Sequence, residues 1–259
     1  MRIITCNVNG LRSAHAKGFT AWLARRKPDV ACFQEIKARE ADLPPGLVAP
    51  RGLHAFFHPA EKRGYSGVAI YSKVEPQRVT LGLGIPEIDA QGRFLEADYG
   101  KLSVVSLYMP SGTMGEEAQR RKYAFMDRFL PRLGEMRACG REFVICGDWN
   151  IAHREIDVKN WKSNQKTTGF LPREREWLTR VFEEHGFVDV FRALDPSPDR
   201  YTWWVQWANA RERNIGWRID YQVATPGIAA LARRAAIYTK EVFSDHAPVV
   251  IDYDYELGS

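Results

Sequence analysis

The stretch that organises this chain is Glu142-Phe143-Val144-Ile145-Cys146-Gly147-Asp148-Trp149-Asn150. It begins with an apolar run whose length and composition predict a buried β-strand. Gly147 ends that run, and a glycine there lets the backbone turn sharply or approach a ligand closely. Asp148 and Asn150 lie two residues apart, so in extended backbone they face one cavity. The aspartate can take a proton or bind a cation, and the amide can donate to a developing negative charge. The alternative is an ordinary turn, because Gly, Asp and Asn all favour turns.

Length and composition predict one globular domain. The chain has 259 residues, of which 45% are hydrophobic and 27% charged, and it contains no repeat or linker that would divide it. We therefore expect a single domain over residues 1–259, with a disordered tail at about residues 255–259. It contains no apolar stretch of about 18 residues, so we expect no membrane span. The charge balance of 37 − 32 = +5 permits an anionic partner.

The cysteines indicate a reducing compartment. Cys6, Cys32, Cys139 and Cys146 form no CxxC pair, and three of them sit inside apolar runs. The N-terminus lacks the layout of a secretory signal. We therefore expect a cytoplasmic protein, associated with the nucleoid if bacterial. A monomer is the default expectation. Because no Cys/His set has zinc spacing, a zinc site is not expected.

Short strands outnumber helices in the pattern of the chain. Apolar and alternating runs predict strands at residues 2–6, 29–33, 53–58, 67–72, 93–99, 101–108, 142–146, 201–207, 217–224, 233–238 and 249–253. Helical periodicity predicts helices at residues 19–26, at 116–138, where Pro131 should kink or break the helix, and from Pro172 to a stop at Gly186. Such a pattern favours a two-sheet core covered by helices.

Polar residues recur where the predicted strands end. They are Asn7, Glu35, Tyr108, Asp148, Asn150, Asp220, Asp245 and His246. Acids and amides with one histidine suit a hard cation such as Mg²⁺, and a general base beside an amide donor suits hydrolysis of a phosphate ester. Taken singly, each residue has a plainer interpretation. Asn7 is a typical turn residue, Tyr108 a typical core residue, and an Asp-His pair is a common cap or surface turn.

Basic and aromatic residues are mixed in three segments. The first is the predicted connection at 61–66, the second the polar loop at 157–166, and the third a region with four tryptophans between 203 and 217. Such mixtures suit phosphate contacts with stacking, although a solvated loop would be equally polar. The candidate DNA contacts are Lys62, Arg63, Tyr65, Asn160, Lys162, Asn164, Lys166 and Arg211.

Ordered blocks of sequence carry a family resemblance over nearly the whole chain. The blocks are Asn7-Val8-Asn9-Gly10-Leu11-Arg12, Gln34-Glu35-Ile36-Lys37, Gly147-Asp148-Trp149-Asn150-Ile151-Ala152-His153, Gly216-Trp217-Arg218-Ile219-Asp220-Tyr221 and Ser244-Asp245-His246-Ala247-Pro248. Together they resemble the exonuclease III family of abasic-site DNA repair endonucleases. The resemblance implies an α/β four-layer sandwich of the deoxyribonuclease I type, with two mostly antiparallel sheets flanked by helices. It also implies cleavage 5′ to abasic sites in duplex DNA with Mg²⁺, for which Mn²⁺ can substitute.

The resemblance also implies a role for each strand-end residue. Glu35 is the main metal ligand, with Asn7 and Asp245 close to it and a second ion position at Asp148 and Asn150. Asp148 activates the attacking water, and Asn7 and Asn150 donate to the phosphate. Tyr108 lies against the scissile phosphate. His246, oriented by Asp220, stabilises the transition state. The pocket for the extruded sugar is formed by Trp203, Trp217 and Ile219.

Three other functions stay open from the sequence. A specialised 3′-phosphatase or 3′-5′ exonuclease would act on blocked 3′ ends with little abasic-site activity. A phosphatase of the same fold would act on small or lipid phosphates and show no preference for duplex DNA. A non-catalytic nucleic-acid-binding module would keep the fold but lose part of the polar set, which is intact in this chain.

Overall fold

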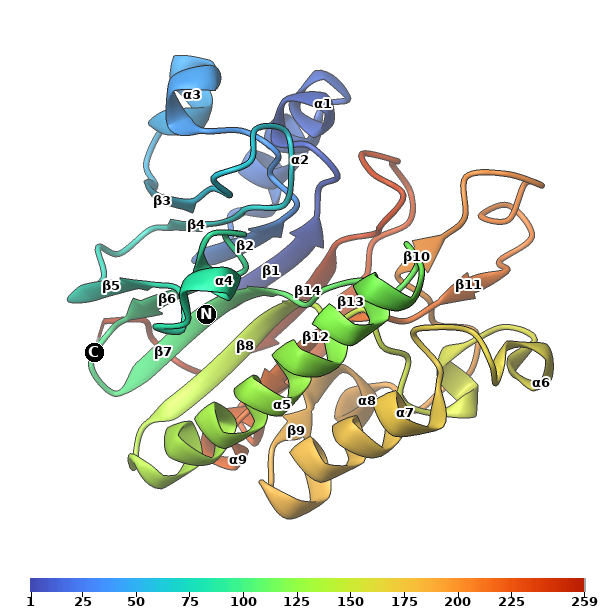
Figure 1. Ribbon diagram of the computed structural model, residues 1–259. Helices are drawn as coiled ribbons and strands as arrows, with labels where there is room; N and C mark the ends of the chain where they lie inside the picture. The colour runs from blue at the N-terminus through green and yellow to red at the C-terminus, as the bar shows by residue number, and fades with distance from the viewer. Residues whose placement is uncertain (259) are drawn as a thin grey trace.

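Two six-stranded sheets form the centre of the computed structural model, which describes residues 1–258 (Figure 1). The order of the first sheet is β13 (Ala232–Ile237), β14 (Val249–Tyr253), β1 (Arg2–Asn7), β2 (Val30–Gln34), β4 (Val68–Ser72), β3 (His54–His58). The order of the second is β5 (Arg78–Leu81), β6 (Phe94–Asp98), β7 (Leu102–Tyr108), β8 (Glu142–Asp148), β12 (Asp220–Ala224), β9 (Val188–Asp189). Only the pairs β1–β2 and β7–β8 are parallel among the described strands, so both sheets are mostly antiparallel, as predicted.

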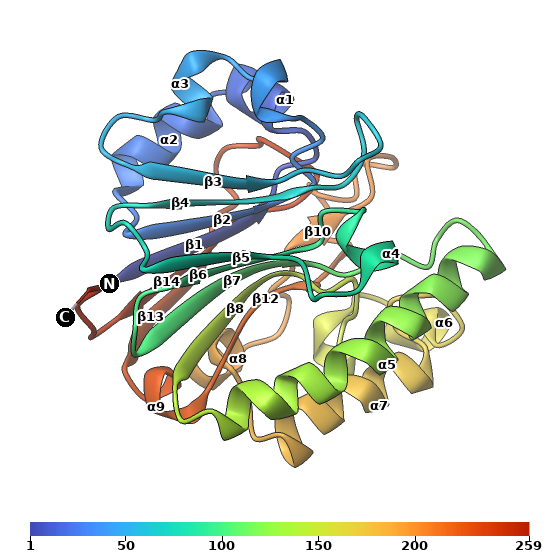
Figure 2. The ribbon, with the colours of Figure 1, turned by 60° about the vertical axis from the view of Figure 1, so that its left-hand side comes forward.

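Helices cover the outer face of each sheet, which makes four layers (Figure 2). The first sheet is covered by α1 (Leu11–Ala16), α2 (Phe19–Arg26) and α3 (Pro45–Val48). The second is covered by α5 (Glu116–Ala138) and by α7 (Pro172–Thr179), which continues as a π-turn over Arg180–Glu184. One apolar core lies between each sheet and its helices, and another lies between the two sheets. The predicted sandwich is therefore confirmed.

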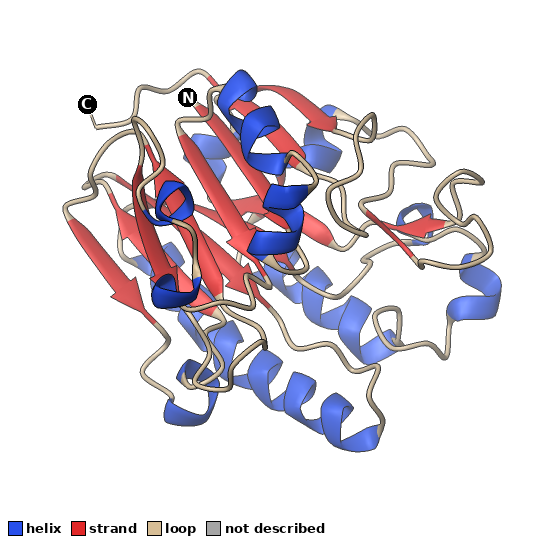
Figure 3. Ribbon diagram, turned by 90° about the horizontal axis from the view of Figure 1, so that it is seen from above, coloured by secondary structure: helices blue, strands red, loops and turns tan. Residues whose placement is uncertain are grey.

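Short elements complete the chain. They are α4 (Pro86–Asp89), α6 (Trp161–Asn164), α8 (Val190–Leu194), α9 (Pro226–Ala229), single 3₁₀ turns at Glu40–Asp42 and Glu155–Asp157, and the two-stranded ribbon of β10 (Trp203–Trp204) and β11 (Gly216–Trp217). The ribbon and α6 stand at one end of the sandwich, beside the large sheets (Figures 1 and 3). None of the helices in residues 1–258 is long and apolar enough to cross a membrane.

The helix at Glu116–Ala138 runs without a break through Pro131. A proline inside a helix removes one backbone hydrogen bond and crowds the preceding turn. Pro131 lies on the exposed face of α5, so water can bond to the carbonyl that the proline leaves without a donor. The prediction left a kink or a break open, and no break occurs.

Two strand predictions are wrong in extent. The strand predicted at residues 217–224 is divided, because Gly216–Trp217 belongs to the ribbon and Asp220–Ala224 to the second large sheet. The strand predicted at residues 201–207 is reduced to Trp203–Trp204. In the first case the interruption falls at Arg218, a buried charged residue that needs partners which a sheet interior does not offer.

Gly147 lies within β8, which extends to Asp148. It pairs with Leu107 of β7 and Tyr221 of β12. A Cβ atom at this position would collide with the carbonyl oxygen of Leu107. The glycine therefore serves the close approach of two strands, and the sharp turn considered from the sequence does not occur.

The two chain ends lie together at the end of the sandwich away from the ribbon (Figure 1). The amino group of Met1 donates to the carbonyl oxygens of Tyr253 at 2.8 Å and Tyr255 at 2.7 Å. Tyr255 and Leu257 pack against the core between the sheets. Ser259, the last residue of the tail expected to be disordered, lies outside the described residues.

Candidate active site

The strand-end residues predicted from the sequence meet at the ribbon end of the sandwich. Asn7 ends β1, Tyr108 ends β7 and Asp148 ends β8. Asp220 begins β12, and because β12 runs antiparallel to β8, Asp220 lies directly beside Asp148 in the sheet. Glu35 follows β2, which runs parallel to β1, and Asp245 and His246 precede β14, which runs antiparallel to β1. Sheet topology therefore brings residues 7 and 246 to one site.

Asn7 connects the two sheets. Its buried side-chain amide donates to Oε1 of Glu35 at 2.8 Å and to Oδ2 of Asp148 at 2.9 Å. Its Oδ1 accepts from the backbone N–H of Asn9 at 3.0 Å. Both amide hydrogens and the carbonyl oxygen are thus engaged within the site. The side chain sets the spacing of two carboxylates that come from different sheets.

Glu35 is held in its ionised form by a lysine that the sequence analysis did not single out. Lys37 Nζ lies 2.8 Å from Oε2 of Glu35 and also donates to Asn9. Burial would raise the pKa of Glu35, but the Lys37 ammonium and the Asn7 amide outweigh it and lower that pKa. Lys37 belongs to the same block as Glu35, so its nearness in sequence was the available signal.

Asp148, Asp220 and His246 form a buried group whose ligand atoms all lie within 4.8 Å of one another. His246 Nδ1 is 2.9 Å from Oδ2 of Asp220, and Nε2 is 3.8 Å from Oδ2 of Asp148. Burial would lower the pKa of His246, but Asp220 and Asp148 raise it to about 10. Burial raises the pKa of Asp148 to about 7, against the opposing charge of His246. The histidine is therefore a charged donor, and Asp148 can exchange a proton near neutral pH.

Asp245 completes the carboxylate cluster, which we define as Glu35, Asp148, Asp220 and Asp245. It accepts from Asn9 Nδ2 at 2.9 Å, from Trp203 Nε1 at 3.1 Å and from Ser244 Oγ at 3.0 Å. Burial would raise the pKa of Asp245, but His246 and these donors lower it. Asn9 stands within this network, and its neutral amide links Asp245 to Lys37.

Asn150 has a strained backbone that a buried ion pair supports. Its φ is 51°, in the left-handed region. Its backbone N–H donates to Asp148 Oδ1 at 2.9 Å, and its Nδ2 donates to the carbonyl oxygen of Met109 at 2.9 Å. Lys122 Nζ donates to the Asn150 carbonyl oxygen at 2.8 Å and lies 2.6 Å from Oε1 of Glu174. The lysine and the glutamate have no solvent exposure, and neither was predicted from the sequence to have a role.

Tyr108 lies against Arg93, another residue that sequence reasoning missed. The Arg93 guanidinium carbon is 4.7 Å from the Tyr108 ring centre and 5.7 Å from that of Tyr65. Its Nη2 donates to the Tyr65 hydroxyl at 2.7 Å. Burial and the charge of Glu35 raise the pKa of Tyr108 well above its usual value, so the phenol stays protonated and can donate. Arg93 links this tyrosine to the predicted DNA-contacting loop.

The three residues predicted to form the sugar pocket pack in one apolar cluster, and we call this cluster the apolar pocket after that predicted role. Trp203 and Trp217 meet edge to face with ring centres 6.5 Å apart, and Ile219 is buried beside them. The Trp203 ring is also 6.4 Å from the His246 ring. The pocket is therefore next to the carboxylate cluster. Both tryptophans are half-buried.

The predicted DNA-contacting residues differ in the solvent exposure of their side chains. Lys62, Arg63, Tyr65, Lys162 and Lys166 have exposed side chains. Four of the five are basic, which suits contacts to a phosphate backbone.

Of the other predicted DNA contacts, Asn160 is exposed, whereas Asn164 and Arg211 make hydrogen bonds within the protein. Asn160 is an exposed residue at the start of α6, and Asn164 Nδ2 donates to its carbonyl oxygen at 3.1 Å. Arg211 packs over the Trp204 ring at 4.6 Å and donates to the carbonyl oxygen of Ser244 at 3.0 Å. Arg211 thus braces the loop that carries Asp245.

The residues of the carboxylate cluster suit a hard cation. Its carboxylates outnumber the nearby cations, Lys37 and His246, and they come together at a largely buried place. Oδ1 of Asp220 has no hydrogen-bond partner among the described residues. A surplus of buried carboxylate oxygens is costly without a cation, and oxygen ligands are those that Mg²⁺ and similar ions prefer. With a charged histidine donor and an aspartate that can take a proton, the site can hydrolyse an ester of phosphoric acid.

Known proteins are similar to this chain in both fold and sequence. Residues 4–246 match the Endonuclease/Exonuclease/phosphatase family. An exodeoxyribonuclease of Bacillus subtilis is 38% identical over 251 residues, which is 96% of this chain and 98% of that protein. An AP endonuclease from Archaeoglobus fulgidus superposes with a TM-score of 0.90 at 31% identity, over 98% of this chain and 100% of that one. A 3′ phosphatase from Neisseria, solved with a product DNA hairpin, gives 0.89 at 26% identity over the same shares.

Proposed function

Because the chain belongs to the Endonuclease/Exonuclease/phosphatase family, we propose that it is a metal-dependent DNA repair nuclease. The reaction that the site supports best is hydrolysis of the phosphodiester 5′ to an abasic site in duplex DNA. One observation carries this choice: the apolar pocket of Trp203, Trp217 and Ile219 lies directly beside the carboxylate cluster. A nuclease without lesion preference has no need of an apolar pocket at that place.

Mg²⁺ is the proposed cation, with Mn²⁺ as a substitute. Glu35 would hold it, with Asp245 and Asn7 nearby, and Asp148 with Asn150 would supply a second position. When bound, the ion stabilises the charge that develops on the phosphate and lowers the cost of grouping these carboxylates. The choice of Mg²⁺ rests on the oxygen-rich donor set.

The side chains divide the chemistry between them. Asp148, whose pKa is raised to about 7 mainly by burial, accepts a proton from the attacking water. His246 stays charged and donates from Nε2 to a phosphate oxygen, while Asp220 holds its Nδ1. Asn150 keeps one amide hydrogen for the phosphate, and the Tyr108 hydroxyl supplies a further donor. Since both amide hydrogens of Asn7 are engaged by carboxylates, we propose that Asn7 orients them.

Substrate selection follows from the apolar pocket. An abasic nucleotide leaves the helix at low cost because little base stacking is lost. The sugar can then lie against the two tryptophans, where an intact nucleotide would also have to fit its base. The exposed Lys62, Arg63, Lys162 and Lys166 would hold the flanking phosphates.

Other activities at the same site are compatible with this geometry. Removal of 3′ nucleotides, and of phosphate from blocked 3′ ends, uses the same phosphate-binding groups. A specialised 3′-phosphatase or exonuclease is the second candidate, and the structural similarity to the Neisseria 3′ phosphatase favours it. A phosphatase of small or lipid phosphates has less support, because such an activity would not explain the apolar pocket or the basic loops.

We further propose that residues 1–259 act as one domain and as a monomer. The site draws on residues from Asn7 to His246, so no smaller part would be complete. The described cysteines are free thiols, three of them buried. This state suits a reducing intracellular location, which we propose as cytoplasmic.

The test is incision of a labelled duplex with one abasic-site analogue, with Mg²⁺, with Mn²⁺ and with chelator alone. An undamaged duplex and a duplex ending in a 3′-phosphate serve as comparisons. Metal-dependent cutting 5′ to the lesion, faster than release of undamaged nucleotides, is the expected result. Rapid loss of the 3′-phosphate without lesion cutting would establish the second candidate, and no reaction on any duplex would overturn both.

A further inference from the structure

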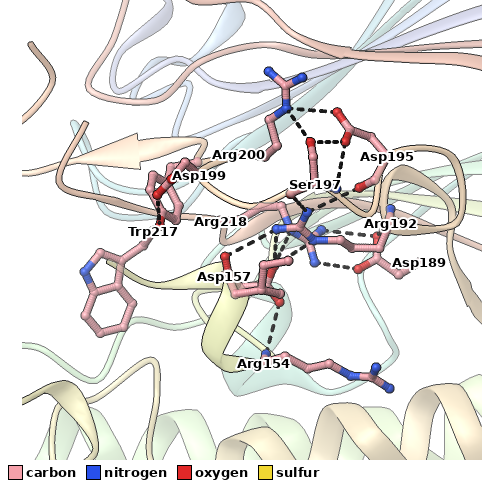
Figure 4. Close-up of polar contacts among 12 residues, drawn as sticks. Arg154, Asp157, Asp189, Arg192, Asp195, Ser197, Asp199, Arg200, Trp217 and Arg218 are labelled. Atoms are coloured by element: carbon pink, nitrogen blue, oxygen red, sulfur yellow. Dashed lines mark hydrogen bonds and ion pairs between the residues drawn. The ribbon is translucent and has the colours of Figure 1, made fainter. Parts of the chain in front are cut away.

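Arg218 carries a fully buried charge between two residues of the apolar pocket. Its side chain is 1% exposed, and Trp217 and Ile219 precede and follow it in the chain. Those two residues belong to the apolar cluster that also contains Phe170. Figure 4 shows the Trp217 indole pointing away from the group of charges that the Arg218 side chain enters. The arginine therefore anchors, from behind, the short segment that forms the pocket wall.

The guanidinium of Arg218 fills a clamp of two carboxylates, Asp157 and Asp189. Its Nε donates to Oδ1 of Asp157 at 2.8 Å. Its Nη1 and Nη2 donate to the two oxygens of Asp189 at 3.2 Å and 2.6 Å. Such a two-pronged contact fixes both the position and the plane of the guanidinium. Arg192 donates to the same Asp157 oxygen at 2.8 Å from Nη2, so two arginines balance two aspartates.

Asp157 and Arg218 each stabilise the charged form of the other. Burial would raise the pKa of Asp157, but Arg218 and Arg192 lower it to about 2. Burial would lower the pKa of Arg218, but Asp157 and Asp189 raise it well above its usual value. The contact between Asp157 and Arg218 is therefore an ion pair at neutral pH.

The pocket wall has little room to move on its other side. A Cβ atom on Gly169 would lie only 3.2 Å from Cζ3 of Trp217, so the indole packs directly on that backbone. The backbone N–H of Arg218 donates to the carbonyl oxygen of Asp157 at 2.8 Å, which ties the same segment a second time. The Trp217 indole thus packs on the Gly169 backbone, and the segment next to it in the chain is tied to Asp157.

We propose that Arg218 is a positioning residue that sets the width of the apolar pocket and thereby keeps out nucleotides that still carry a base. This inference rests on the proposed function. A sugar without a base needs less room than a nucleotide, so a rigid wall can select by size, and a loosened wall admits both. The Asp220 end of the segment is held separately, because its N–H donates to Thr202 Oγ1 at 3.1 Å. Loosening the clamp should therefore change selectivity more than chemistry.

Arg218→Lys is the direct test, because lysine keeps the charge but cannot contact both aspartates as a planar fork. We would measure kcat/KM for a duplex with an abasic-site analogue and for release of undamaged nucleotides from a recessed 3′ end. The expected ratio of abasic to undamaged kcat/KM falls about tenfold, which corresponds to about 1.4 kcal/mol of lost discrimination. An unchanged ratio in the folded variant would overturn the inference.

Arg141→Lys is the matched control. Arg141 also donates to a carboxylate and a hydroxyl, those of Asp98 and Ser103, but it lies just before β8, at the end away from the site. Its variant should keep the wild-type ratio, and an equal fall would show that the effect is unspecific. If Arg218→Lys does not fold, Asp189→Asn removes one charge of the clamp at constant size and is judged by the same ratio. Failure of the wild type to cut the abasic duplex would instead overturn the proposed function itself.

Discussion

At the scale of single residues, the site depends on side chains that each hold two others. Asn7 separates Glu35 from Asp148, and His246 lies between Asp220 and Asp148. A residue of this kind cannot be replaced without moving both of its partners. The effects of neighbouring substitutions should for this reason not be additive.

Glu35→Ala and His246→Ala should each abolish most incision of an abasic-site duplex. The first removes the main proposed metal ligand, and the second removes the charged donor to the phosphate. We expect losses of at least about a hundredfold in kcat, the usual effect of removing one such group. Circular dichroism should show both variants folded. Near wild-type turnover in either variant would refute the role proposed for that residue.

Asp220→Asn should lower the pKa of His246. In the wild type that pKa is raised from 6.5 to about 10, because Asp220 and Asp148 outweigh burial. A raised histidine pKa contributes stability that is fully present below pH 6.5 and is lost as the pH rises through about 10. The free energy of unfolding should therefore fall over this interval in the wild type, and fall less in the variant.

The histidine prediction is checked in two ways. Titration of the His246 imidazole by NMR reports its pKa in each protein, and urea unfolding at several pH values reports the stability. A wild-type His246 that titrates near the ordinary value of 6.5 would refute the charged-donor role.

Trp217→Ala should weaken abasic-site cleavage more than it weakens general DNA affinity. The indole belongs to the apolar cluster, whereas the phosphate contacts proposed for general affinity come from the lysine and arginine side chains. We expect kcat/KM on the lesion to fall at least about tenfold, whereas Kd for undamaged duplex changes by less than about threefold. Equal losses would mean that Trp217 is only a core residue or a nonspecific contact.

At the scale of elements, one buried ion pair joins two helices to the site. Lys122 of α5 reaches both Glu174 of α7 and the carbonyl oxygen of Asn150. Glu174 in turn accepts from the backbone N–H of Gly169, on which Trp217 packs. One pair therefore supports the loop after β8 and a wall of the apolar pocket.

Lys122→Met should destabilise the protein by about 3–5 kcal/mol, because it leaves the Glu174 charge buried without its partner. Urea unfolding gives the free energy. The matched control is Arg173→Met, since Arg173 pairs with Asp127 in a salt bridge whose side chains are 55% and 62% exposed. That variant should unfold at nearly the wild-type urea concentration. A similar small effect for Lys122→Met would mean that the pair adds little to the fold.

At the scale of the whole molecule, some of the exposed cations lie at the end that carries the site. The loop with Lys62 and Arg63 and the α6 region with Lys162 and Lys166 belong to that end (Figure 1). Lys27 and Lys101 are also exposed but lie at the end with the chain termini. The net charge of +5 does not distinguish these two groups, but their positions relative to the site do.

Replacing Lys162 and Lys166 together by Gln should reduce the salt dependence of duplex binding. Each lost phosphate contact lowers the slope of log Kd against log salt by about 0.9. The double variant should lose about 1.8 in slope, and the control double variant at Lys27 and Lys101 should lose nothing. Equal slopes in both would show that the α6 region does not contact DNA.

The sequence by itself determined most core strands, the main helices and the kinds of polar residue at the strand ends. The core strands, the helices at Phe19–Arg26 and Glu116–Ala138, and the acids and amides at strand ends all follow from patterns within short windows. Side-chain periodicity is a local property, so local patterns are enough to predict it. The ordered motifs added the family, which the similarity of residues 4–246 confirms.

Only the tertiary structure decided which of these residues work together. Asn7 and Asp148 are 141 positions apart and come from different sheets, and Lys122 and Arg218 find their partners on other elements. Arg211, a candidate DNA contact in the sequence, is turned inward to Ser244. Such pairings depend on sheet order and strand register, which no short window of sequence contains. A buried charge must find a partner wherever the fold brings one, and its position in the chain does not reveal which partner that is.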